Sequence, residues 1–192
     1  MKGKFQAILC IGLTVLLITL SGCQSLSSSD SHGLPSESTL KTYKSLFGQS
    51  LEQVTKSLKL TGLDESMEDS GIWVPDETVA VCGEEWSIAV HMDPTTDALL
   101  ALSYGFETND LTSFSTLAEE VLSTAKETYG EPAENGYSPK LSSSLEAVKD
   151  GQVGSWFEGW NTPQDVGITL IASVVEHGDN PYMLVLEFSP NA

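Results

Sequence analysis

The sequence predicts an α+β domain in which helices pack on one face of a twisted antiparallel sheet. Two observations lead to this class. Segments with a helical period open the chain after residue 39 and recur in its middle. Short runs rich in β-branched and aromatic residues lie between and after them, separated by turns with Gly, Pro, Asn or Asp. The order of helices, strands, helix and strands suggests two α-β-β-(β) repeats, with halves at 39–108 and 109–192.

Apolar residues spaced three or four apart predict three helices. Gly48 separates the first two, and Ser50 followed by Gln53 forms a capping-box pattern at the start of the second. The third has one apolar stripe with charged residues away from it, and Gly130 and Pro132 end it. The predicted helices span 40–47, 51–58 and about 112–129.

Seven runs of alternating character predict strands over 72–74, 78–82, 86–91, 99–106, 155–160, 166–176 and 182–188. The acidic segment 64–69 is expected to be a loop, because it carries too much charge to pack. The polar stretch 134–154 is long for a connector, so we expect it to be either mobile or functional. It has one predicted helical turn near Leu145 and Val148.

The N-terminal segment has the layout of a secretory signal peptide. Lys2 and Lys4 precede an uncharged run of 16 residues over 5–20, which is shorter than the roughly 20 residues that a membrane-spanning helix needs. A serine-rich stretch with few large apolar residues follows Cys23 and predicts a tether. The expected organisation is a signal peptide at 1–22, a tether at 23–38 and one α+β domain at 39–192.

Leu20-Ser21-Gly22-Cys23 closes the apolar run and resembles the lipobox of bacterial lipoproteins. The resemblance implies cleavage after Gly22, attachment of a diacylglyceryl group to the thiol of Cys23, and frequent N-acylation of the new terminus. Two or three acyl chains hold a protein stably on a membrane. The implied protein is extracytoplasmic and lipid-anchored to the bacterial cell membrane.

The charge of the chain is strongly negative. The formal net charge is −18. Removal of residues 1–22 leaves seven lysines and 27 acidic residues, which gives a net charge of −20. The sequence contains no arginine. Such a field repels phosphate backbones, which excludes nucleic acid as a partner, and favours a basic protein surface or Ca²⁺. A surface that is merely well solvated is the alternative.

Cys82 is the one cysteine left for the domain once Cys10 and Cys23 are assigned to the signal and the lipid. No disulfide is therefore expected. Glu84 and Glu85 follow it closely, and adjacent negative charge raises the pKa of a thiol, whereas a reactive cysteine needs a lowered one. We predict a buried structural cysteine.

A second resemblance concerns the start of the domain. Residues 43–54, Tyr-Lys-Ser-Leu-Phe-Gly-Gln-Ser-Leu-Glu-Gln-Val, are similar to the helix-Gly-x-Ser/Thr-x-x-x-Val opening of small repeats in β-lactamase inhibitory proteins and in SmpA-type outer-membrane assembly lipoproteins. The resemblance implies a helical pair laid on an antiparallel sheet. It also implies that the open face of the sheet grips another protein.

The candidate binding residues are Trp156, Glu158 and Trp160, which strand alternation places on one face, with Phe157 on the other. If Phe157 faces the core, the two indoles lie on the open sheet surface as interface anchors or sugar platforms. The alternative is a pair of core tryptophans with Glu158 near a strand edge. Both interpretations stay open at this level.

Metal and catalytic motifs give little support to other functions. The run Asp64, Glu65, Glu68 and Asp69 offers oxygen ligands for Ca²⁺ without EF-hand spacing, and His91 and His177 have no partner at zinc-ligand spacing. The sequence lacks Gly-x-Ser-x-Gly, His-Glu-x-x-His and a phosphate-binding loop. We predict a binding module for a protein partner, without enzymatic activity, metal or cofactor. The alternatives are a cell-wall or glycan hydrolase with a carboxylate pair, and a carbohydrate- or Ca²⁺-binding module.

Overall fold

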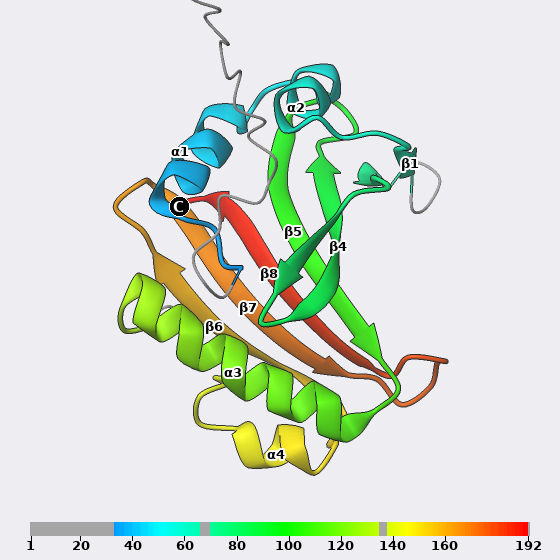
Figure 1. Cartoon of the computed structure of the whole chain (residues 1–192), viewed down its shortest axis with the longest axis vertical. Helices are drawn as coiled ribbons and strands as arrows, with labels where there is room; N and C mark the ends of the chain where they lie inside the picture. The colour runs from blue at the N-terminus through cyan, green and yellow to red at the C-terminus, as the bar shows by residue number, and fades with distance from the viewer. Residues whose placement is uncertain (1–32, 66–69, 135–137, 192) are drawn as a thin grey trace, which may run out of the picture.

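The α+β class is confirmed by the computed structural model, which describes residues 33–65, 70–134 and 138–191 (Figure 1). Within these residues an open antiparallel sheet of eight strands carries four helices. The helices are α1 (Glu37–Leu46), α2 (Leu51–Leu58), α3 (Leu111–Tyr129) and α4 (Leu145–Lys149). The strands are β1 (Asp64–Glu65), β2 (Ile72–Val74), β3 (Thr78–Val81), β4 (Glu84–Met92), β5 (Leu99–Thr108), β6 (Gly154–Asn161), β7 (Val166–Val174) and β8 (Tyr182–Pro190).

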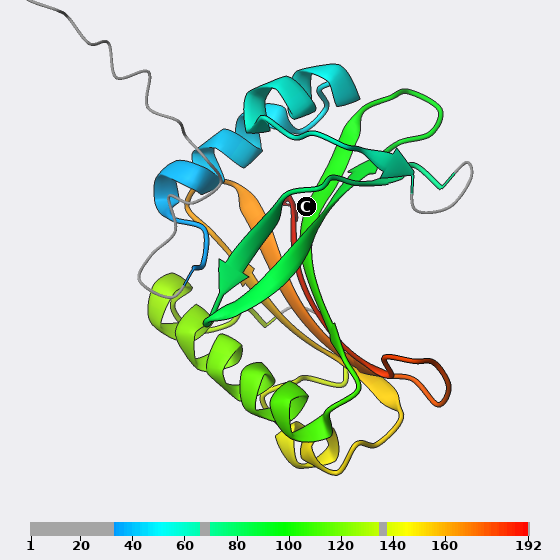
Figure 2. The same ribbon diagram turned by 45° about the vertical axis from the view of Figure 1, so that its right-hand side comes forward.

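The strands run in the order β1-β2-β4-β5-β8-β7-β6, and β3 also pairs with β4. Two strands share one edge of β4. Thr78 of β3 pairs with Ser87 near the start of β4, and Trp73 of β2 pairs with Val90 near its end. The β3–β4 hairpin therefore leaves the plane of the other strands and bends toward the helices (Figure 2).

Each half of the domain ends in a three-stranded antiparallel meander, β3-β4-β5 in the first half and β6-β7-β8 in the second. The first half has two further strands, β1 and β2, between its helices and its meander. The last strands of the two meanders, β5 and β8, pair antiparallel in the middle of the sheet. The suggested division into two α-β-β-(β) repeats stays a prediction.

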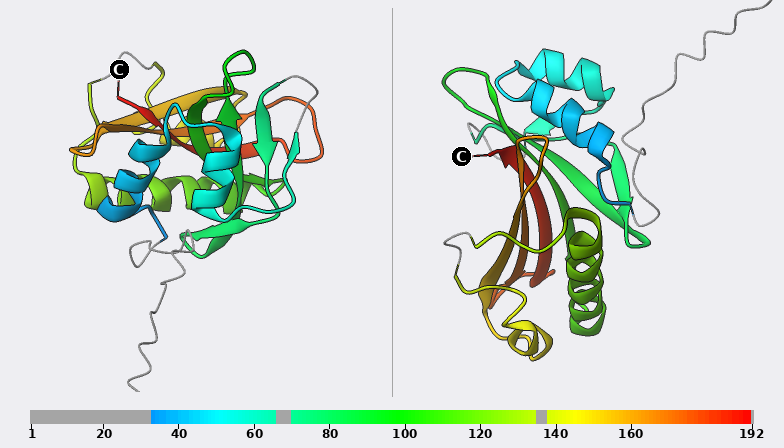
Figure 3. Two further views of the ribbon diagram at one scale, coloured as in Figure 1. Left: turned by 90° about the horizontal axis from the view of Figure 1, so that it is seen from above. Right: turned by 90° about the vertical axis from the view of Figure 1, so that its left-hand side faces the viewer.

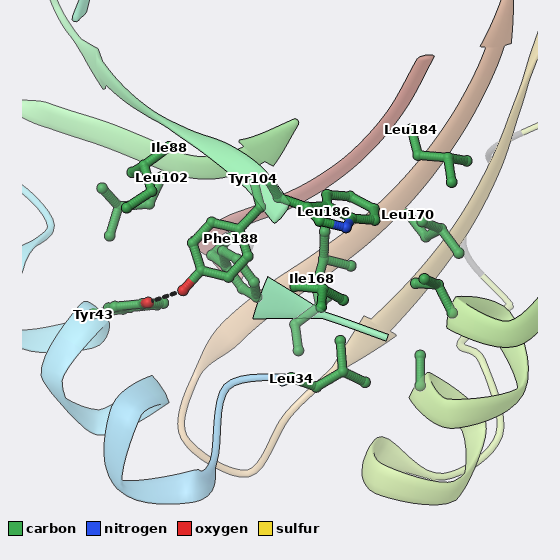
Figure 4. Packing of buried hydrophobic residues seen from close by; sticks show 14 of the residues in the cluster. Leu34, Tyr43, Ile88, Leu102, Tyr104, Ile168, Leu170, Leu184, Leu186 and Phe188 are labelled. Atoms are coloured by element: carbon green, nitrogen blue, oxygen red, sulfur yellow. Dashed lines mark hydrogen bonds between the residues drawn. The ribbon is translucent and has the colours of Figure 1, made fainter. Parts of the chain in front are cut away.

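The core lies between the sheet and the helices, and the right-hand view of Figure 3 shows α1 and α3 on the same side of the sheet. Its aromatic centre joins Tyr43 of α1 to Tyr104 of β5 through a hydrogen bond between their hydroxyls (Figure 4). The ring of Phe188 lies 5.3 Å from that of Tyr43 and 5.0 Å from that of Tyr104. Burial raises the pKa of both tyrosines, so their hydroxyls stay protonated.

Local signals fix the ends of the helices. The backbone N–H of Ser50 donates to Gln53 Oε1 at 3.2 Å, as the capping-box pattern predicts. Asp110 Oδ1 accepts from the backbone N–H of Ser113 at 2.7 Å at the start of α3, and Gly130 follows its end with φ +87°. The three long predicted helices are confirmed to within a few residues.

The packed chain begins earlier than residue 39. Helix α1 starts at Glu37 behind the N-cap Ser36, and Leu34 is completely buried. Gly33 lies so close to β3 that a Cβ there would be 1.9 Å from the carbonyl oxygen of Ala80. The predicted tether boundary at 38 therefore includes residues that belong to the core.

The outer edge of β6 is covered by the chain that precedes it. Leu141 N–H donates to Phe157 O at 2.9 Å, Phe157 N–H donates to Pro139 O at 3.1 Å, and Ala133 N–H donates to Gly159 O at 2.7 Å. Leu141 itself is fully buried. The described part of the stretch 134–154 is thus packed against the sheet, and its predicted helical turn is confirmed as α4.

Candidate functional site

The tryptophan pair in β6 faces the core. Trp156, Glu158 and Trp160 share one face, as strand alternation predicts, but Trp156 is 6% exposed and Trp160 is 2% exposed. The indole N–H of Trp160 donates to Gly130 O at 2.9 Å, directly after α3. The prediction of two indoles on the open sheet surface is wrong, because α3 and the segment that follows it cover this face of β6. The burial of both indoles agrees with the alternative of a pair of core tryptophans.

Glu158 lies between the two indoles and is 1% exposed. Its Oε2 accepts a hydrogen bond from the backbone N–H of Ser142 at 2.9 Å. A buried carboxylate needs such partners. The side chain therefore fixes the segment that covers the β6 edge and is not accessible to a partner.

The side of the sheet without helices, which we call the open face, carries the residues that alternate with the core positions. Its central row joins successive Cα partners across five strands: Ser87, Gly105, Val185, Ile171 and Phe157. All of these residues except the exposed Ser87 are partly buried. The face is therefore formed by small residues toward β4 and by larger apolar residues toward β6.

The larger residues form an apolar patch, defined as Phe157, Ile171, Met183 and Val185. The registers Phe157 to Ile171 and Ile171 to Val185 place three of them side by side. Val153 and Val175 lie just beyond the ends of the adjacent strands and are 63% and 48% exposed. An apolar surface of this kind is typical of a protein-binding site.

Carboxylates predominate among the charges of the strands that form the open face. None of the eight described strands contains a lysine, and the chain has no arginine. Glu85, Glu107 and Glu187 occupy open-face positions on β4, β5 and β8. Lys140, which bridges Phe157 from the segment along the β6 edge, places one lysine beside the apolar patch.

A polar cluster lies near the middle of this face. His91 Nε2 is 2.8 Å from Ser103 Oγ, and Ser103 is the Cα partner of Glu187. The three residue types match those of hydrolase triads, and a hydrogen bond between serine and imidazole is part of that arrangement. Ser103 is only 5% exposed, however, so a substrate has little access to its hydroxyl. The cluster suits hydrogen bonding within the sheet surface better than attack on a substrate.

The stability of the domain is expected to fall on mild acidification because of His91. Burial lowers the pKa of its imidazole below the usual 6.5, and the Glu187 carboxylate partly opposes this. As the pH falls through about 6.5, His91 binds a proton more readily in the unfolded chain than in the folded one, so the free energy of unfolding decreases. Above this pH the imidazole is neutral in both states and the domain keeps its full stability.

Chemical denaturation at pH 7.5 and pH 5.5 measures this effect. His91→Gln should lose less stability between the two values than the wild type does. His177→Gln, in an exposed turn, is the matched control and should behave as the wild type. An equal acid loss in the wild type and in His91→Gln would contradict the assignment.

A pocket of about 260 Å³ lies where the start of α1, the end of α3 and the β6–β7 turn meet. Glu37 is the one carboxylate that lines it. Its Oε1 is 2.7 Å from Lys41 Nζ, and this lysine lowers the pKa of Glu37. A glycosidase pair needs a second carboxyl group and an acid of raised pKa, so this pocket does not supply the carboxylate pair of the hydrolase alternative.

The acidic run takes part in the sheet. Asp64 and Glu65 pair with Val74 and Trp73 as β1, so the prediction of a loop is wrong for these two residues. Glu65 Oε1 accepts from the backbone N–H of Gly71 at 3.1 Å. Glu68 and Asp69 lie outside the described residues, and among the described ones no group of three or more His, Cys, Asp or Glu is placed to hold a metal ion.

Comparisons with known proteins give no relative: no family model, curated protein or solved structure matches the chain. The likeness of residues 43–54 to repeats of β-lactamase inhibitory proteins and SmpA-type lipoproteins stays a prediction. Cys23 and the signal segment lie outside the described residues. Across the part of the chain that is described, no helix has the length and apolar content to cross a bilayer.

Sequence reasoning did not single out the residues of the apolar patch. Alternation along β7 does mark Ile171 as lying opposite the core positions Leu170 and Ala172. The alternation shows only which residues of β7 share a face. It does not say which strands lie beside it, so it could not show that Val185 and Phe157 complete the patch.

Proposed function

We propose that this protein is a membrane-tethered, extracytoplasmic lipoprotein that binds a protein partner through the open face of its sheet. The anchor is the lipid on Cys23, for which the lipobox sequence is the support. Intact mass measurement of the protein from its native cells, with Cys23→Ser as the comparison, tests this part.

The observation that carries the binding proposal is the combination found on the open face. An apolar patch around Ile171 and Val185 lies beside the carboxylates of Glu107 and Glu187, while Lys140 lies at its far side, next to Phe157. Interface cores are apolar and their rims are polar. The partner is therefore a protein with an apolar contact surface bordered by lysine or arginine, and its association is expected to weaken with salt.

Capture of partners from native envelope tests this proposal. The double variant Ile171→Lys, Glu107→Lys changes two side chains that point away from the core, so the domain should fold. Binding of the specific partner should fall by more than about tenfold, because a buried apolar contact is lost and the charge is reversed.

The matched control is Ser123→Lys, Glu120→Lys on the exposed side of α3, which changes the net charge by the same amount. It should capture the partner as the wild type does. Unfolding midpoints confirm that both variants are folded. Equal recovery of the partner by the wild type and the open-face variant would refute the proposed site.

A further inference from the structure

The helical hairpin formed by α1 and α2 differs in charge from the remainder of the domain. Residues 34–60 contain four lysines and two glutamates, a net charge of +2. Residues 61–192 contain three lysines and 24 acidic residues, a net charge of −21. The lysines of the hairpin are Lys41, Lys44, Lys56 and Lys59.

These lysines lie on the outer side of the hairpin. Leu40 and Tyr43 of α1 and Val54 of α2 are buried against the sheet, whereas Lys41, Lys44, Lys56 and Lys59 are on the solvent side. Lys41 pairs with Glu37 at 2.7 Å and Lys44 with Asp165 at 3.4 Å, in both cases with largely exposed side chains. Exposed pairs of this kind are weak and exchange readily with other anions.

The tether enters the domain beside this hairpin. Gly33 packs on the backbone of Ala80, Leu34 enters the core next to α3 and the sheet (Figure 4), and α1 begins at Glu37. Nine residues separate Gly33 from Cys23. Their root-mean-square reach is about 17 Å, so a lipid on Cys23 keeps the hairpin close to the membrane surface.

We propose that the α1–α2 hairpin rests on anionic lipid headgroups and that the open face of the sheet consequently points away from the membrane. The inference rests on the lipid anchor of the proposed function. A negative membrane surface attracts lysines within a Debye length and repels the strongly acidic remainder of the domain. The open face lies on the other side of the sheet from α1 (Figure 3), where a partner can reach it.

Lysine modification of the full lipidated protein tests the orientation. The protein is reconstituted in vesicles of phosphatidylcholine alone or with about 30% phosphatidylglycerol, an anionic fraction chosen to give a strongly negative surface. A neutral amine-acylating reagent is added, and mass spectrometry follows each lysine. The four hairpin lysines should react about threefold or more slowly in the anionic vesicles. Lys140 and Lys149 are internal controls and should react equally in both. Lys126 is not used as a control, because it lies in the last turn of α3, whose Tyr129 hydroxyl donates to Pro35 O at 3.0 Å where the tether enters.

The variant Lys56→Glu, Lys59→Glu makes the hairpin net negative and leaves Lys41 and Lys44 as reporters. Their protection should disappear, while the variant still floats with the vesicles and melts as the wild type does. Equal reaction of all seven lysines in both vesicle types, or protection that survives in the variant, would overturn the orientation alone. If the wild-type protein from its native cells carries no lipid on Cys23 and does not float with the vesicles, the anchor is refuted, and the orientation with it.

Discussion

Trp160→Ala is expected to lower the free energy of unfolding by about 3–5 kcal/mol, which is a large part of the stability of an ordinary domain. The indole is 2% exposed and its N–H donates to the carbonyl of Gly130. The substitution removes the buried ring, leaves a cavity between β6 and α3, and leaves that carbonyl without this donor. Trp156→Ala, with 6% exposure, should cost a similar amount.

Urea denaturation followed by circular dichroism measures this loss. Asn161→Ala is the control in the same strand, because Asn161 is exposed and its truncation should change stability by less than about 0.5 kcal/mol. The result also separates the two interpretations of the tryptophans. If Trp160→Ala were as stable as the wild type and lost a binding partner instead, the indole would have to be on the surface.

Leu34→Ala is expected to cost about 2–5 kcal/mol, although the residue lies in a serine-rich segment that has the composition of a linker. Leu34 is fully buried in the main core, so its truncation creates a cavity there. Gly33→Ala should be at least as harmful. Its φ of +86° disfavours a side chain, and the new Cβ would lie 1.9 Å from the carbonyl oxygen of Ala80, which belongs to the backbone of β3.

Gly48→Ala is the matched control for the glycine. Its φ is +79°, but a Cβ there has no heavy atom within 4 Å, so it should cost only the backbone term of about 1 kcal/mol. Thermal unfolding of the three variants ranks these effects. Similar melting temperatures for Gly33→Ala and Gly48→Ala would show that the chain before α1 does not pack on β3.

Local signals explain why most elements could be predicted. The capping pair Ser50 and Gln53, the stop at Gly130 and the alternation in β4 and β7 all act within a few residues of the chain. The strand β1 was missed because Asp64 and Glu65 pair through their backbone, whereas the prediction considered their side chains. Leu34 was missed because one apolar residue among serines has no periodicity.

The candidate site depended on information that is not local. Alternation shows that Trp156 and Trp160 share a face, but which face is covered depends on α3 and on the segment that bonds to Glu158. In the same way, the open face exists because β5 pairs with β8, which brings Gly105 beside Val185. No pattern within either strand specifies that partner.

The covering of the β6 edge bears on how copies of this chain meet one another. An uncovered edge strand of eight residues offers free amide and carbonyl groups to the edge of a neighbouring copy, and crowding in two dimensions would promote such additions. Pro139 and Leu141 already use the groups of Phe157 on that edge. The segment before β6 thus occupies the groups through which a neighbouring copy could add to this edge of the sheet.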